Sequence, residues 1–199
     1  IFTAVMADAG KTLIQSMTVF GVSMGALIGL PPSLVEIYSG GIRKVYRVNG
    51  VPFCLGLVLT NISAFIHLFM MSVILYAAAP LAFGAEIPEN PGAYFAGLAV
   101  FILISLSAAS VIGLAVKDQT QTSMFSILVF LPSILLSGIM FPGELLPAGF
   151  EAVGKLFPAF WGYRLMTENA FRLEDVLPLL LIFAVAAFVC GILLGRACD

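Results

Sequence analysis

The residues most suggestive of chemistry are the run Asp8 to Thr12 (DAGKT), which resembles the end of a phosphate-binding loop. Such a loop needs a glycine five positions before its last glycine, so that backbone N–H groups can surround the phosphates. Val5 occupies that position ahead of Gly10. We therefore expect this chain to bind neither a nucleotide nor another cofactor.

His67 is the single histidine of the chain and lies inside a long apolar run. An ionisable side chain within a membrane helix is a functional candidate, for example in a proton relay. The apolar runs hold no carboxylate that could share such a proton. A neutral histidine bonded to a neighbouring helix is the reading that we favour. The runs also lack a Ser/His/Asp or Cys/His set and a metal-ligand cluster, so we expect no catalytic and no metal-binding residues.

The elements that position these residues are predicted to be membrane helices. Of 199 residues, 61% are hydrophobic and 10% are charged, and the mean hydropathy is +1.10. A soluble domain carries about 25% charged residues, because water solvates charges that lipid penalises. The net charge of −2 and the absence of a strongly basic tract argue against nucleic acid as a partner.

Five apolar runs are each long enough to cross a bilayer, which takes roughly 20 residues in a helix. The sequence therefore predicts an all-α, polytopic transmembrane bundle in a single domain over residues 1–199. The predicted spans are about 13–32, 52–80, 93–116, 122–141 and 176–196. The first span is expected to close at Pro31 and Pro32. Pro132 lies inside the fourth and should kink it.

Three glycines, Gly21, Gly25 and Gly29, recur at every fourth position of the first run. This spacing places them on one helix face and lets a second helix approach closely. Glycines scattered by chance in a membrane span are the alternative. We favour a helix–helix contact.

Two segments are not predicted to cross the membrane. Residues 33–50 are the most polar and basic stretch and read as a short amphipathic helix in a loop. Residues 142–175 mix aromatic clusters with prolines and glycines, which fits two short helices that enter or lie on one leaflet. The dense basic cluster at 43–47 places the first segment in the cytoplasm, and the second then faces outward.

The order of these features resembles the permease subunit of the ABC-2 family of ATP-binding-cassette exporters. One segment that carries the resemblance runs from Glu36 to Lys44 (EIYSGGIRK) and on to Pro52. The other is Leu136 to Pro147 (LSGIMFPGELLP), followed by Pro158. It is very similar to the family's signature of SG, FP and LP with a later proline.

The resemblance implies roles for these segments. The first would be a coupling helix seated on a cytoplasmic ATPase, and its residues would be Glu36, Gly41, Arg43, Lys44 and Arg47. The second would be a re-entrant hairpin that shapes the outer exit, and its residues would be Phe141, Pro142, Glu144, Leu146, Pro147, Phe157 and Pro158. The family has six spans, so these five would be spans two to six, and one span would precede Ile1.

The resemblance also implies partners and a location. A second permease subunit, identical or different, would complete the path through the membrane lipid of a bacterial or archaeal inner membrane. The uncharged spans favour an amphipathic, drug-like or lipid-like substrate. A membrane anchor or scaffold subunit of a larger complex is the alternative, because it would use the same glycine faces for packing.

Overall fold

The computed structural model describes residues 12–39, 46, 48–50, 52–139, 148–167 and 173–198. This part of the chain is helical and contains no strand. In chain order the helices are α2 (Leu13–Met24), the π-helical turn η1 (Gly25–Gly29), α3 (Leu30–Ser39), α5 (Phe53–Phe83), α6 (Pro91–Ala115), α7 (Gln119–Leu135), α8 (Ala148–Gly154), α9 (Pro158–Thr167) and α10 (Leu173–Cys198).

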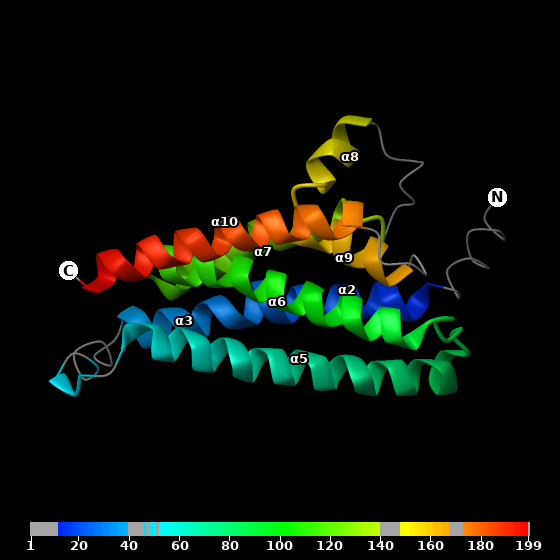
Figure 1. The fold of residues 1–199 in the computed structure, drawn as a ribbon, viewed down its shortest axis with the longest axis horizontal. Coiled ribbons are helices and arrows are strands. Elements are labelled where there is room, and N and C mark those ends of the chain that lie inside the picture. The colour runs from blue at the N-terminus through cyan, green and yellow to red at the C-terminus, as the bar shows by residue number, and fades with distance from the viewer. Residues whose placement is uncertain are drawn as a thin grey trace.

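The long helices form a bundle in which they run side by side and alternate in direction (Figure 1). The end of α3, the start of α5 and the C-terminus lie at one end of the bundle, and the α8–α9 segment lies toward the other (Figure 1). Helix α6 is central and packs against α3, α5, α9 and α10. It can do so because Gly113 lets α3 approach: a Cβ there would lie 2.9 Å from the Cβ of Leu34.

Four helical stretches are long and apolar enough to cross a membrane, within the described residues: Leu13–Tyr38, Cys54–Phe83, Pro91–Ala115 and Asp175–Gly195. They confirm the predicted all-α, polytopic bundle. Helix α7 packs among them with 17 residues. That is about 25 Å of helix, against a hydrocarbon thickness of about 30 Å. The fifth crossing therefore remains a prediction, with α7 as its helix.

The first helix differs from the prediction at its end. It does not close at Pro31 and Pro32 but continues to Ser39. Helix α2, the turn η1 and helix α3 thus follow one another as one continuous helix, which we call the first rod, and residues 33–39 belong to it. A proline removes one N–H donor and crowds the carbonyl four residues earlier. The wider turn η1 comes just before the prolines, and such π adjustments accommodate proline in membrane helices. The Ser33 hydroxyl also donates to the Gly29 carbonyl at 3.5 Å.

Helix ends follow local sequence signals. The Asn90 side chain accepts a hydrogen bond from the backbone N–H of Ala93 at 3.2 Å, and Pro91 opens α6. The Asp118 carboxylate accepts from the N–H of Thr120 at 3.1 Å at the start of α7. These side chains satisfy N–H groups that the first turn of a helix leaves without partners.

Side-chain hydrogen bonds tie α6 to its neighbours. The hydroxyls of Thr18 on α2 and Tyr94 on α6 lie 2.7 Å apart. The Asn61 amide on α5 donates to the Ser110 hydroxyl at 3.0 Å. In lipid, polar side chains of this kind hold helices together because the alternative is a poorly solvated polar group.

Candidate functional sites at the two ends of the bundle

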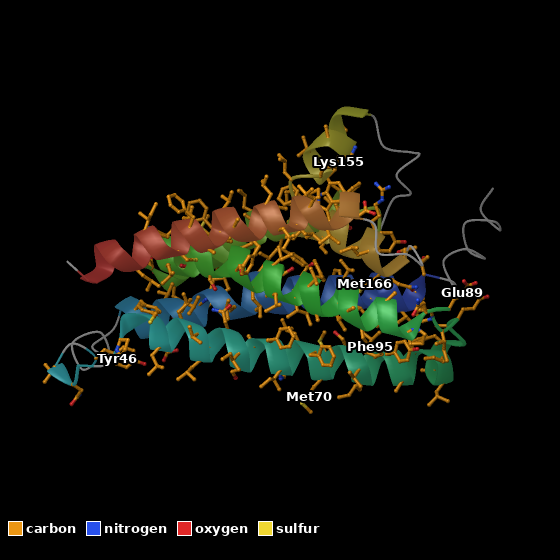
Figure 2. The ribbon with its side chains drawn as sticks, viewed as in Figure 1. Tyr46, Met70, Glu89, Phe95, Lys155 and Met166 are labelled. Atoms are coloured by element: carbon orange, nitrogen blue, oxygen red, sulfur yellow. The ribbon has the colours of Figure 1, made fainter. Side chains whose placement is uncertain are left out.

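One of the predicted coupling residues, Glu36, lies toward the end of the bundle where α3 stops. Glu36 is exposed on α3. Gly41, Arg43, Lys44 and Arg47 lie outside the described residues. Tyr46, from the same basic segment, is described and lies beside the start of α5, at the opposite end of the bundle from Glu89 (Figure 2). Tyr46 and the α5–α6 loop therefore lie at opposite ends of the bundle (Figure 2).

A joint between α3 and α5 holds this end together. The backbone N–H of Leu57 donates to the Tyr38 hydroxyl at 2.9 Å. Gly56 permits the close approach, because a Cβ there would lie 3.3 Å from the Cγ2 of Ile37 and 3.3 Å from the Cε2 of Tyr46. We call Ile37, Tyr38, Tyr46, Gly56 and Leu57 the α3–α5 joint. The sequence alone does not reveal that Tyr38 and Gly56 meet, because their contact joins residues on either side of a chain reversal.

The predicted outer hairpin contains two short helices, α8 and α9. Pro158 is buried as the first residue of α9, where its missing N–H costs nothing, and Phe157 before it is half-buried. The other hairpin residues of the prediction, Phe141, Pro142, Glu144, Leu146 and Pro147, lie outside the described residues.

Helix α9 is packed into the bundle. A Cβ on Gly162 would overlap the ring of Phe101 on α6, so the two helices meet at this glycine. The Trp161 indole N–H donates to the Lys155 carbonyl at 2.7 Å, which fixes the turn between α8 and α9. The end of α8 also lies against the end of α7, since a Cβ on Gly154 would lie 2.6 Å from the Leu136 carbonyl oxygen. The hairpin is thus attached to both α6 and α7.

An ion pair links the hairpin to the last span. The Arg164 Nε on α9 lies 3.2 Å from an Asp175 carboxylate oxygen on α10, and the Asp175 side chain is only 3% exposed. A buried carboxylate needs such a counter-charge, because its desolvation is expensive. In the sequence Asp175 stands at the polar edge of the last apolar run, and nothing there identifies it as an ion-pair partner.

A family model described as ABC-2 type transporter matches residues 42–171. The chain belongs to the ABC-2 type transporter family. No curated protein gives a significant match to the chain. The matched range runs from the predicted coupling segment through α5, α6 and α7 to the end of the hairpin region, and it ends before Asp175. The resemblance of the sequence to the ABC-2 family is therefore confirmed.

The three glycines of the first rod of this ABC-2 chain do not share one environment. A Cβ on Gly21 would lie 2.8 Å from the Cε of Met71, and one on Gly25 would overlap the Leu68 side chain, so both lie where the first rod meets α5. Gly29 has nothing within 4 Å of its would-be Cβ. Gly29 is therefore not part of the close contact that Gly21 and Gly25 make with α5.

Within the described residues, no three His, Cys, Asp or Glu side chains come together to hold a metal ion. This part of the ABC-2 fold has a hydrogen-bonded joint at one end, a docked hairpin toward the other, and a central helix, α6, that contacts α3, α5, α9 and α10. Packed interfaces of this kind move as rigid bodies between discrete arrangements.

Proposed function

We propose that this chain is the permease subunit of an ABC-2 exporter, which forms the path through the membrane and draws its energy from a separate cytoplasmic ATPase. Membership of the ABC-2 transporter family supports a transport role. The observation that carries the coupling role is the α3–α5 joint. Tyr46 of the basic segment lies against Gly56 of α5, and the Tyr38–Leu57 hydrogen bond ties α5 to α3.

The joint suggests how movement would pass from the ATPase to the spans. Because α3 continues the first rod, a displacement of the helix around Glu36 would move that whole rod. The Tyr38–Leu57 hydrogen bond would carry the same displacement to α5. Gly41, Arg43, Lys44 and Arg47 would contact the ATPase. ATP binding and hydrolysis would thus favour one of two packings of the bundle.

In this proposal two permease subunits pair, as a homodimer or a heterodimer, in the inner membrane of a bacterium or archaeon. The α8–α9 hairpin of each subunit would shape the outer exit, and its attachment to α6 and α7 would couple the exit to the spans. The apolar character of the described spans favours an amphipathic, drug-like or lipid-like substrate.

The test is to co-express the chain with a candidate ATPase from a neighbouring gene and purify the complex. Wild-type permease should retain the ATPase, and the double charge reversal R43E/K44E should lower ATPase activity in proteoliposomes at least fivefold. Lys117→Glu is the matched control, because Lys117 is an exposed cation in the α6–α7 link, and it should change activity less than twofold.

Two outcomes would contradict the proposal. If no ATPase co-purifies with the wild-type chain, the permease role is wrong. If an associated ATPase is indifferent to R43E/K44E, the chain serves as an anchor or scaffold, because an anchor needs binding without transmission of movement.

A further inference from the structure

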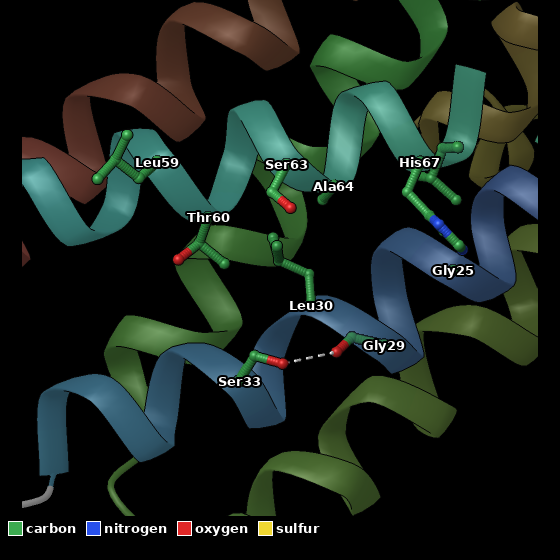
Figure 3. Close-up of a pocket in the computed structure, with 10 residues that line it drawn as sticks. Gly25, Gly29, Leu30, Ser33, Leu59, Thr60, Ser63, Ala64 and His67 are labelled. Carbon is green, nitrogen blue, oxygen red and sulfur yellow. Dashed lines mark hydrogen bonds between the residues drawn. The ribbon is translucent and has the colours of Figure 1, made fainter. Parts of the chain in front are cut away.

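A pocket of about 630 Å³ opens between α5 and the η1–α3 part of the first rod. Figure 3 shows Thr60, Ser63 and His67 projecting from α5 toward the first rod, which contributes Ser33 and Gly29. The buried side chains of Leu30 and Leu68 supply apolar walls. The pocket therefore combines hydrogen-bonding groups with apolar surface, as sites for small molecules do, and its volume lies in the range of about 300–1,000 Å³ that such sites occupy.

The pocket lies deep in the membrane. His67 stands 14 residues after Phe53 and 16 before Phe83, so it is near the middle of the 31-residue helix α5. Helix α5 is about 46 Å long, which puts His67 near the bilayer midplane. Bulk water is absent at that depth, and an unsatisfied polar group there costs several kcal/mol.

The polar side chains of the pocket can form further hydrogen bonds. Thr60 donates to the Gly56 carbonyl at 2.8 Å, and its oxygen can still accept a hydrogen bond. The Ser33 bond to Gly29 is long, at 3.5 Å. Ser63 and His67, one helical turn apart, make no hydrogen bond to another described residue. A ligand that hydrogen-bonds to both would satisfy two polar groups with which lipid tails cannot form hydrogen bonds.

Direct contacts close both ends of the pocket. Toward the outer end, Leu68 and Met71 of α5 lie against Gly25 and Gly21. Toward the other end, the α3–α5 joint brings the helices together again. The open part on α5, residues 59–68, is about 14 Å long. A small molecule fits between these contacts.

We propose that this pocket binds an uncharged amphipathic molecule, with a hydroxyl or amide that hydrogen-bonds to Ser63 and His67 and a short apolar body against Leu30 and Leu68. The ligand would be uncharged because no Asp, Glu, Lys or Arg lines the pocket. It would enter sideways from the hydrocarbon. The inference deepens the proposed export function by giving its substrate class a binding site within one subunit.

The test uses the purified full chain in phosphatidylcholine vesicles and a photoactivatable octanol that carries a diazirine. Irradiation and peptide mass spectrometry should place its adducts mainly in residues 25–33 and 59–68. An excess of plain octanol should compete with this labelling. A diazirine-bearing octane, which lacks the hydroxyl, should label lipid-facing helices without preference for the pocket. Pocket labelling that is equal for both probes would mean that the pocket holds lipid tails and would overturn the proposal.

Variants sharpen the test. His67→Phe and Ser63→Ala should each lower octanol labelling of the pocket about three- to tenfold, the effect of one hydrogen bond in a membrane. His67→Gln keeps hydrogen-bonding groups and should retain most of it. Gly29→Phe fills open space and should block labelling. Ser107→Ala, in a separate pocket of about 570 Å³ between α5, α6 and α10, should leave labelling unchanged.

This experiment and the coupling experiment fail independently. Pocket labelling is measured without an ATPase, so a specific result would stand even if no ATPase co-purified. Conversely, the ATPase could respond to R43E/K44E while the octanol adducts are spread evenly over the lipid-facing helices. That result would leave the permease role in place and refute the proposed binding site. Labelling that His67→Phe and Ser63→Ala do not reduce would refute it as well.

Discussion

The Tyr38 hydroxyl, at the end of the first membrane helix, accepts a hydrogen bond of 2.9 Å from the backbone N–H of Leu57 near the start of the second. The intervening segment includes the basic cluster, and the chain reverses direction there. A single phenol oxygen thus joins two spans beside the segment that we propose to contact the ATPase.

Removing that oxygen should uncouple the two spans. Tyr38→Phe keeps the ring but deletes the acceptor, and we expect a loss of about 0.5–1.5 kcal/mol of stability and an ATPase activity in the reconstituted complex that is lowered several-fold. Tyr46→Phe is the control, because it also removes a phenol hydroxyl but keeps the ring, whose Cε2 contacts Gly56. Equal effects of the two variants would argue against the joint as the transmitting element.

The contact of Gly162 with Phe101 should be sensitive to one added methyl group. Gly162→Ala forces a Cβ into the Phe101 ring, and such overpacking costs about 1–3 kcal/mol. Trp161 is the single tryptophan and lies next in the chain on α9, so its fluorescence reports the position of the hairpin. We expect a red-shifted emission and a lower melting temperature in detergent.

Gly149→Ala on α8 is the matched control for this contact, because its would-be Cβ meets nothing within 4 Å. It should leave both the Trp161 emission and the melting temperature unchanged. The double variant Gly162→Ala with Phe101→Leu should recover part of the lost stability, since the smaller side chain makes room for the methyl group. A Gly162→Ala protein with native emission and stability would show that α9 is not held against α6.

The Arg164–Asp175 ion pair predicts an asymmetry between its two partners. Arg164→Gln removes the counter-charge of a carboxylate that is 3% exposed, whereas Asp175→Asn leaves an arginine that is 40% exposed and can be solvated. We therefore expect about 2–3 kcal/mol of destabilisation for the first variant and about 1 kcal/mol for the second. Thermal unfolding followed by Trp161 fluorescence measures both.

Glu86→Gln, at an exposed acid in the α5–α6 loop, should have no effect and serves as the control for removing a surface charge. A larger loss for Asp175→Asn than for Arg164→Gln would mean that the carboxylate acts chiefly through its other contacts and not through the arginine.

The sequence alone determined the class of the molecule and most of its helices. Long uncharged runs such as 93–116 are typical of membrane spans, and a backbone in lipid must form helices to satisfy its own hydrogen bonds. The predicted bounds of that run lie close to those of α6, Pro91–Ala115. The aromatic and proline-rich segment after residue 142 likewise predicted short helices, because it is too interrupted to span and too apolar for a free loop.

The tertiary structure decided what depends on neighbours. Proline signals alone predicted a break at Pro31, but the helix continues after a π turn, and Pro31 lies against Gly113 of α6. Regular spacing predicted one contact face for Gly21, Gly25 and Gly29, yet Gly29 faces open space beside the pocket. Hydropathy is a property of each residue and can be summed along a chain. A pocket or an ion pair belongs to residues far apart in sequence, and only the packing of the helices brings them together.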